Sequence, residues 1–484
     1  MKIKFDFFEN ICLMSDSYKM GHWKMYLKDT QKVYSYLEAR NGAKFNKTVF
    51  YGLQYILKRY FIGQVVTQEK IDEAEMIINA HLGKGVFNRE GWEYILNRHN
   101  GRLPLRIMAV PEGTAVDVNN VMMTVENTDK ENCEWLTNFV ETELLHVWYS
   151  MTVATLSREC KIMIKDYLLR TTDNLDALKW MLHDFGERSS TTLESAAFAG
   201  SAHLAAGWMG TDTVPALTLI MKYYGADCQL LNQEEFNEVN VAKEMPGFSV
   251  AATEHSIMTA RGEAGEFDVV EHLYNEFDTG VLSTVIDSYN YENYITVLGT
   301  RFKDRVLNRN GRTVFRPDSG DPVCVTLRCL ELLGEYFGYT TNEKGFKVLN
   351  DKVRVLWGDG IDYYGIRDVL FAMTNHGWSV ENIIFGMGGG LHQKVNRDVQ
   401  RFAFKCSAQM FDDIWHDVYK KPKDITKMSK RGRLALIKEG DKFVTIREEE
   451  LGDRKNYLEL VFENGEMIKE YTFDEVRENS KIII

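Results

Sequence analysis

Short apolar runs that end abruptly in a charged or glycine residue recur through the middle of this 484-residue sequence. The clearest is Thr313-Val-Phe-Arg316, which continues into the turn residues Pro317-Asp318-Ser319-Gly320. Four further runs have the same form, at residues 182–186, 283–288, 353–360 and 383–390. In a (β/α) barrel the carboxyl ends of the parallel strands converge on the active site. Five such runs in succession therefore predict a barrel enzyme.

Helix-length segments separate these runs from about residue 180 to 390, an alternation typical of a parallel α/β layout. Beyond residue 400 the pattern changes to two predicted hairpins, at 433–446 and 458–468, and the second has an Asn464-Gly465 turn signal. We therefore predict an α/β protein with two domains. An irregular (β/α) barrel occupies residues 151–394, and a mixed α+β domain is built from both chain ends, residues 1–150 and 395–484.

The first part of the chain has mixed patterns. Apolar residues at helical intervals predict helices over residues 67–82 and 151–170. Two strands are predicted between Leu105 and Glu126, separated by Pro111-Glu112-Gly113. The polar stretch 226–244 lacks a clear period and is predicted to be a surface insertion.

Composition and charge exclude several classes of function. The formal net charge of −12 argues against nonspecific nucleic-acid binding, which requires a basic face. No run approaches the roughly 18 apolar residues of a membrane span, and acidic residues occupy the N-terminus where a signal peptide would be apolar. The seven scattered cysteines form no Cys-x-x-Cys pair and indicate neither zinc nor a disulfide framework. We expect a cytoplasmic protein with reduced thiols, bound to neither nucleic acid nor membrane.

A glycine-rich segment, Gly386-Met387-Gly388-Gly389-Gly390, follows an apolar run and precedes a predicted helix start. Glycines let the backbone approach a phosphate closely, and a helix start adds N–H donors. Arg397 and Lys405 lie downstream and could complete a phosphate site, the first as a fork-shaped ligand and the second as a point charge. The alternative is a tight turn followed by two solvated surface cations.

Three aspartates, Asp287, Asp318 and Asp359, follow predicted strands and would converge at one edge of the barrel. Converging carboxylates are costly unless they hold a cation or bind hydroxyls, so Mg²⁺ or a ribose diol is the natural occupant. Each aspartate alone has the alternative of capping the following helix. His255, beside Glu254, is a candidate general base or phosphate-accepting nucleophile, with a purely structural histidine as its alternative.

Several motifs together resemble the nicotinamide phosphoribosyltransferase family nearly end to end and in consistent order. The motifs are Asp16-Ser-Tyr18-Lys19, Tyr34-Ser-Tyr36, Thr48-Val-Phe-Tyr-Gly52, His183-Asp-Phe-Gly186, Gly210-Thr-Asp212, Arg316-Pro-Asp-Ser-Gly320, Gly358-Asp-Gly360 and Phe404-Lys-Cys-Ser407. The resemblance implies a barrel of the type II phosphoribosyltransferase kind in an obligate homodimer, with active sites shared between subunits. It also implies condensation of nicotinamide with 5-phosphoribosyl 1-pyrophosphate to nicotinamide mononucleotide and pyrophosphate. The implied cofactor is Mg²⁺, held mainly by substrate phosphates, and ATP is an implied co-substrate acting through a phosphohistidine.

The resemblance also implies roles for individual residues. Phe185 and the partner subunit's Tyr18 would sandwich the pyridine ring, Asp212 would accept from the carboxamide N–H₂, and Ser283 would lie near its carbonyl. The ribosyl hydroxyls and 5′-phosphate would be held by Asp318, Gly358, Asp359, Gly388 and Gly389. Further phosphate contacts would come across the subunit interface from Arg397 and Lys405, and Arg40 would join from the partner subunit. The pyrophosphate or γ-phosphate would lie among Arg188, His255 and Arg316, with Asp287 orienting His255 or serving the Mg²⁺ shell.

Two residues depart from the family pattern, because Glu187 replaces an aromatic residue and Met387 replaces a serine. Glu187 places a negative charge near an anion site and bears on ATP coupling. Two other functions compete with the first. Nicotinate phosphoribosyltransferase is disfavoured by Asp212, whose carboxylate would repel nicotinate. The second is a pyridine-nucleotide-binding homologue with weakened catalysis. It is disfavoured because the clusters of arginines, aspartates and His255 would then have no use.

Overall fold

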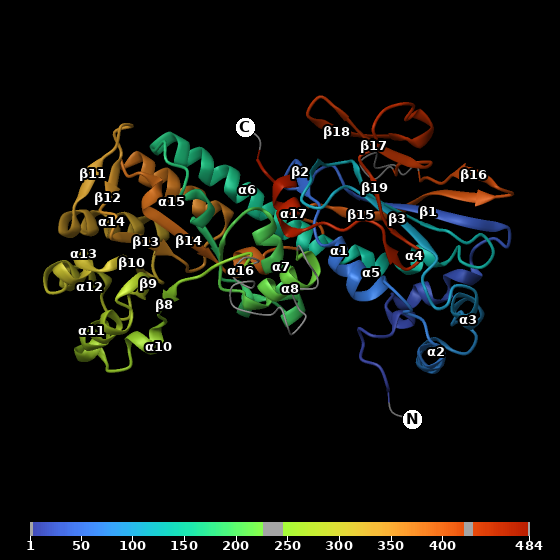
Figure 1. Cartoon of the computed structure of the whole chain (residues 1–484), viewed down its shortest axis with the longest axis horizontal. Coiled ribbons are helices and arrows are strands. Elements are labelled where there is room, and N and C mark those ends of the chain that lie inside the picture. Colours follow the sequence, from blue (N-terminus) through green and yellow to red (C-terminus); the bar gives the residue numbers. More distant parts are fainter. Residues whose placement is uncertain (1–2, 226–244, 421–428, 483–484) are drawn as a thin grey trace. The chain divides into compact units, whose positions relative to one another are not determined.

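The computed structural model of the chain describes residues 3–225, 245–420 and 429–482 (Figure 1). The predicted insertion at 226–244 lies outside the described residues. The described chain forms two compact units. We call residues 3–155, 222–225, 396–420 and 429–481 the two-ended unit, and residues 156–221 and 245–395 the barrel unit. The boundaries predicted from the sequence fall after residues 150 and 394, whereas the chain divides after Thr155 and Val395.

The two-ended unit is built on a seven-stranded antiparallel sheet to which both ends of the chain contribute, drawn in blue and red in Figure 1. In sheet order its strands are β16 (Ile414–Asp417), β15 (Phe402–Phe411), β1 (Thr30–Ala39), β5 (Val121–Asn127), β3 (Leu105–Ala109), β19 (Glu459–Glu463) and β20 (Glu466–Met467). All seven residues of β5 are buried. The helices of this unit are α1 (Leu53–Ile56), α2 (Gln68–Leu82), α3 (Arg89–Arg98), α4 (Leu136–Phe139), α5 (Glu141–Leu145) and α17 (Phe473–Asn479).

Local sequence signals explain several of these elements. Thr67 caps α2 by accepting the N–H of Lys70, and Gly83 ends that helix with a φ of 96°. The turn between β19 and β20 has positive φ at both Asn464 and Gly465, as a type I′ turn requires. The hairpin of β17 (Leu434–Glu439) and β18 (Lys442–Arg447) also forms as predicted.

The two strands predicted between Leu105 and Glu126 are three in the structure. Between β3 and β5, the three-residue β4 (Ala115–Asp117) pairs with β2 (Lys47–Val49) instead of the main sheet. A strand of three residues is too short to show a period of its own, so its pairing depends on a partner distant in sequence.

The barrel unit is built on a parallel sheet of seven strands. In sheet order these are β7 (Gly210–Thr211), β6 (Leu182–Asp184), β14 (Ile383–Met387), β13 (Val353–Trp357), β10 (Asn310–Arg316), β9 (Thr279–Val285) and β8 (Ala251–Ala252). Phe248, just before β8 at one edge, forms a parallel bridge with Gly210 of β7 at the other edge. The Thr211 N–H donates to the Phe248 carbonyl at 3.0 Å. This bridge joins the two edges, and the predicted irregular (β/α) barrel is confirmed.

Helices connect and cover the parallel strands, as right-handed crossovers require. They are α7 (Leu193–Ala205), α10 (His255–Met258), α11 (Glu266–Glu276), α12 (Tyr291–Thr300), α13 (Lys303–Asn308), α14 (Pro322–Phe337), α15 (Tyr363–Asn375) and α16 (Gly389–His392). Two further helices, α6 (Trp148–Thr171) and α8 (Val214–Tyr224), cross the division between the units along the chain. A small hairpin, β11 (Tyr339–Thr341) and β12 (Lys347–Leu349), follows α14.

In two of the barrel strands a charged residue stands at the carboxyl end. All five residues of β13 are buried, as expected for a parallel strand covered on both faces. Asp184 and Arg316 are the last residues of β6 and β10, so the change from apolar to charged residues coincides with the end of each strand. No helix in the described ranges is long and apolar enough to cross a membrane.

Candidate active site

A cleft of about 1000 Å³ lies at the carboxyl ends of the barrel strands. Its charged and aromatic lining residues include Phe185, Glu187, Arg188, Asp212, Glu254, His255, Arg316 and Asp318. A second cavity of about 330 Å³ shares Phe185, Arg188, Arg316 and Asp318 with the first. It adds Gly358, Asp359, Gly388 and Gly389. Residues predicted from separate strand ends are therefore gathered around two adjoining cavities within the barrel unit.

The aromatic ring of Phe185 lines both cavities and packs against Gly386 near the end of β14. The Phe185 N–H donates to the Met387 carbonyl at 3.0 Å, which continues the pairing of β6 with β14. A Cβ at Gly386 would lie 2.1 Å from the Phe185 ring, so only glycine leaves room for the ring there. The Arg316 guanidinium lies 5.2 Å from the ring centroid. The site thus offers an aromatic surface next to a cation, which suits a flat, electron-poor ring.

Arg316 is held in place by a neighbouring carboxylate. Its Nη2 donates to Asp318 Oδ1 at 3.0 Å, and both side chains are about one-fifth exposed or less. Asp318 lines both cavities, while Arg188, on the turn after β6, lines both as well. Two arginines and an aspartate therefore lie at the junction of the cavities, where an anionic group could be bound by the guanidinium donors.

His255 begins the short helix α10 and lines the larger cavity. Its Nε2 lies 3.4 Å from Asp287 Oδ1, and its side chain is 48% exposed while that of Asp287 is 6% exposed. Asp287 also accepts a hydrogen bond from the Ser319 hydroxyl. A buried carboxylate that is itself held by a hydrogen bond can fix the orientation of the imidazole through Nε2. The other ring nitrogen, Nδ1, can then contact a different group.

Asp212 and Ser283, both predicted near the carboxamide, have different places in the barrel unit. Asp212 follows β7, lines the larger cavity and accepts a hydrogen bond from the Ser249 hydroxyl. The Ser283 hydroxyl, within β9, is buried and has no hydrogen-bond partner among the described residues. A buried hydroxyl without a hydrogen bond costs free energy, unless a ligand or a water molecule provides the hydrogen bond.

Beneath the cleft, buried titratable groups support the loop after β6. Burial lowers the pKa of His183, which keeps its ring neutral. Burial would raise the pKa of Asp184, but His392, His203 and Thr213 together outweigh this effect and the pKa is lowered overall. Asp184 stood within a recognised motif and His392 followed the glycine segment, yet neither was predicted as a site residue.

Four predicted site residues, Tyr18, Arg40, Arg397 and Lys405, belong to the two-ended unit. Tyr18 and Arg397 are exposed there. The Arg40 Nε donates to the Arg401 carbonyl at 3.1 Å.

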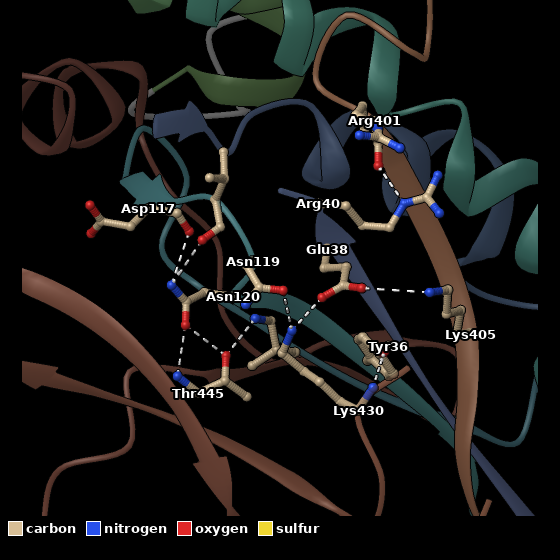
Figure 2. Close-up of polar contacts among 12 residues, drawn as sticks. Tyr36, Glu38, Arg40, Asp117, Asn119, Asn120, Arg401, Lys405, Lys430 and Thr445 are labelled. Carbon is tan, nitrogen blue, oxygen red and sulfur yellow. Dashed lines mark hydrogen bonds and ion pairs between the residues drawn. The ribbon is translucent and has the colours of Figure 1, made fainter. Parts of the chain in front are cut away.

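Lys405 lies in a polar cluster of that unit. Figure 2 shows Glu38 between Lys405 and Lys430, with Lys405 Nζ 3.8 Å from Glu38 Oε1 and Lys430 Nζ hydrogen-bonded to Glu38. Burial lowers the pKa of Lys405, although Glu38 opposes this effect. Two lysines share one carboxylate, so the cluster keeps positive charge for an anion. Lys430 was not predicted, because nothing in its local sequence marks it.

Comparison with known proteins places this geometry in a family. The model for the nicotinamide phosphoribosyltransferase N-terminal domain matches residues 10–107, and that of the nicotinate phosphoribosyltransferase family matches residues 180–466. A nicotinamide phosphoribosyltransferase from Xanthomonas campestris pv. campestris is 41% identical, with 97% of this chain and 98% of the relative covered. The chain belongs to the nicotinamide phosphoribosyltransferase family. A second member, from Acinetobacter baylyi, is 30% identical over 96% of this chain and 95% of its own length.

Solved structures of low sequence identity share the fold of this family member. The chain is similar to a nicotinate-nucleotide pyrophosphorylase from Pyrococcus furiosus, with a TM-score of 0.62 at 14% identity, covering 99% of this chain and 97% of that one. It is also similar to human nicotinic acid phosphoribosyltransferase, with a TM-score of 0.55 at 14% identity, covering 96% and 92% of the two chains. The expected type II phosphoribosyltransferase fold is therefore confirmed.

Proposed function

We propose that this protein condenses nicotinamide with 5-phosphoribosyl 1-pyrophosphate, forming nicotinamide mononucleotide and pyrophosphate for the salvage of NAD. The full-length relatives bear the name of this activity. The observation that carries the choice of nicotinamide is Asp212, whose carboxylate lines the cleft that Phe185 also lines. A carboxylate accepts a hydrogen bond from the carboxamide N–H₂ of nicotinamide and repels the carboxylate of nicotinate.

In the proposed reaction the pyridine nitrogen is the nucleophile, so no side chain need attack carbon. Its lone pair forms the bond to C1′ of the ribose as the bond from C1′ to the pyrophosphate oxygen breaks. The electron pair of the broken bond leaves with pyrophosphate, and the pyridine ring becomes cationic. Arg188 and Arg316 line the cavities and would stabilise the negative charge that develops on the leaving group. Stacking on Phe185, with the partner subunit's Tyr18 on the other face, would orient the ring.

The glycine segment and its neighbours are proposed to hold the ribosyl 5-phosphate. Gly388, Gly389, Gly358 and Asp359 line the smaller cavity, which adjoins the position of the ring. We place the 5′-phosphate against the glycines and the ribose hydroxyls against Asp318 and Asp359. The partner subunit's Arg397, the partner subunit's Lys405 and the partner subunit's Arg40 would supply further cations to the phosphates.

Mg²⁺ is the proposed cofactor. Hard carboxylate oxygens suit this ion, and Asp287 has a buried Oδ1 that meets only His255, at 3.4 Å, among the described contacts. Asp287 and Asp318 would hold the ion together with substrate phosphates. When bound, the ion neutralises charge on the departing pyrophosphate.

ATP is the proposed co-substrate, with His255 as the residue that accepts its γ-phosphate. The support is the exposed position of His255 in the cleft and the anchored carboxylate of Asp287 behind its Nε2. We further propose a homodimer, because Tyr18 is exposed in the two-ended unit and would complete the active site of a second copy. The proposed location is the cytoplasm.

An assay with both pyridines tests the proposal. Purified protein is incubated with Mg²⁺, phosphoribosyl pyrophosphate and either nicotinamide or nicotinate, and the mononucleotides are separated by chromatography. We expect nicotinamide to be the preferred substrate. Asp212→Asn should lower the ratio of nicotinamide to nicotinate use by about 5- to 30-fold. Two like charges 4 Å apart repel by roughly 4 kcal/mol near a protein surface, and solvent at an exposed site reduces this repulsion. Asp304→Asn, an exposed carboxylate on α13, is the control. Preference for nicotinate, or an unchanged ratio in Asp212→Asn, would refute the substrate assignment.

A further inference from the structure

A fully buried histidine–aspartate pair lies behind the cleft. His392 Nε2 is 3.0 Å from Asp184 Oδ1, and both side chains have 0% exposure. Burying such a pair costs free energy that is recovered only with good geometry and further hydrogen bonds. The pair contacts neither cavity directly, and the proposed chemistry does not use it.

His392 is joined to both ends of the turn that carries Phe185. Asp184 precedes Phe185, and its Oδ1 also accepts the Gly186 N–H at 2.7 Å. At the far end of the turn, the Ser190 hydroxyl lies 2.8 Å from His392 Nδ1. His392 Nε2 is thus in close polar contact with Asp184, without the alignment of a hydrogen bond, while Nδ1 is within hydrogen-bond distance of the Ser190 hydroxyl. One imidazole therefore spans the whole turn.

The fit between the imidazole and the turn is close. A Cβ at Gly186 would lie 2.4 Å from His392 Cγ, so the ring packs directly on the turn backbone. His392 itself is the last residue of α16, the short helix that begins at Gly389. His392 thus links the glycine segment to the turn, and a shift of either would change the distance between the Phe185 ring and Gly388–Gly390.

We infer that His392 is a positioning residue that sets the spacing between the Phe185 ring and the glycine segment. The inference rests on the proposed function, in which the ring orients the pyridine and the glycine segment holds the ribosyl phosphate. Bond formation requires the pyridine nitrogen and C1′ to meet within a narrow range of distance and angle. Each substrate can bind to its own half of the site without that alignment. Loss of His392 therefore lowers kcat more than it raises either KM.

Three variants of the full-length protein test this role. His392→Leu keeps similar volume and removes both polar contacts. His392→Gln restores them, because its amide N–H₂ can donate to Asp184 and its oxygen can accept from Ser190. Ser190→Ala removes one contact and leaves the buried pair. We expect kcat to fall about 10- to 100-fold in His392→Leu, the loss expected when reacting groups are misplaced by about 1 Å, with KM changes under about threefold. His392→Gln should recover most of kcat, and Ser190→Ala should lie between.

Binding of nicotinamide mononucleotide, measured by calorimetry, gives a readout that is independent of turnover. The mononucleotide spans both halves of the site, whereas ribose 5-phosphate occupies one. His392→Leu should weaken the mononucleotide at least about tenfold and leave ribose 5-phosphate within about twofold. Thermal melting of each variant reports a purely structural effect.

The possible outcomes are distinct. Equal kcat in His392→Leu and wild type, equal loss in the leucine and glutamine variants, or a fall in melting temperature alone would overturn the inference. If His392→Leu does not fold, Ser190→Ala becomes the deciding variant. Unchanged kcat and unchanged mononucleotide binding in Ser190→Ala would then overturn the inference. Wild-type protein that neither turns over nor binds the mononucleotide would refute the proposed function, and the inference with it. Wild-type activity with unaltered variants would refute the inference alone.

Discussion

Adding one methyl group at Gly386 should weaken nicotinamide binding while leaving the binding of phosphoribosyl pyrophosphate nearly unchanged. The φ of Gly386 is outside the left-handed region, so alanine suits the backbone of β14. Its Cβ would lie 2.1 and 2.2 Å from two carbons of the Phe185 ring. Carbon atoms in contact are about 3.5–4.0 Å apart, so the ring must move by roughly 1.5 Å.

The displacement has two measurable costs. Overpacking of a core position destabilises by about 1–3 kcal/mol. A displaced ring also loses its stacking on nicotinamide, about 0.5–1.5 kcal/mol, which corresponds to a rise in the KM for nicotinamide of roughly 3- to 10-fold. The KM for phosphoribosyl pyrophosphate should change by less than about twofold, because the glycines of the smaller cavity stay in place.

Steady-state kinetics with each substrate varied in turn, together with thermal melting, measures both effects. Gly334→Ala on α14 is the matched control: its Cβ would lie 2.9 Å from Trp378 Cη2, away from the residues that line the cleft. That variant should lose stability without a change in the KM for nicotinamide. An unaltered nicotinamide KM in Gly386→Ala, or the same rise in Gly334→Ala, would refute the reasoning that the Phe185 ring binds the pyridine.

Three further outcomes are expected. His255→Ala should abolish ATP hydrolysis and the acid-labile label from γ-labelled ATP, yet leave slow synthesis of the mononucleotide without ATP; equal labelling of both proteins would exclude His255. Mixed, refolded Tyr18→Ala and Phe185→Ala chains should regain activity, because one shared site per heterodimer is intact, whereas a fully active monomer in sedimentation would contradict a shared site. Burial raises the pKa of Glu266 from 4.5 to about 7, with Glu263 adding to the rise. The contribution of Glu266 to the free energy of unfolding is fully present below its unfolded pKa of 4.5 and is lost as pH rises through 7. In Glu266→Gln, the free energy of unfolding measured with denaturant should therefore change less between pH 4.5 and 7. Parallel curves for the two proteins would show that Glu266 does not contribute.

The sequence alone predicted the barrel and the residues at its strand ends, because both are local properties. An apolar run followed at once by Arg316 and Asp318 marks a strand and its carboxyl end within a few residues. In a parallel sheet those ends must lie at one edge. The sequence alone therefore predicts that Phe185, His255 and Asp318 lie in one cleft.

Elements whose partners are distant in sequence were decided by tertiary structure. The short β4 pairs with β2 rather than with its neighbours in sequence, and the barrel edges meet through a single bridge from Phe248 to Gly210. Neither has enough residues to form a recognisable pattern. The membership of Lys430 in the Glu38 cluster is of the same kind, since a lone lysine in sequence is indistinguishable from a solvated one.

The contact of His392 with Asp184 is the strongest case. Each residue stands beside a recognised motif, but the motifs are some two hundred residues apart, and only the pairing of β14 with β6 brings them together. Whether a histidine is a solvated surface group or a buried hydrogen-bonding partner depends on what packs against it. The local pattern of this chain therefore determined which strands form and where their polar ends lie, whereas the buried contacts that fix the distances between those ends were set by packing across the barrel.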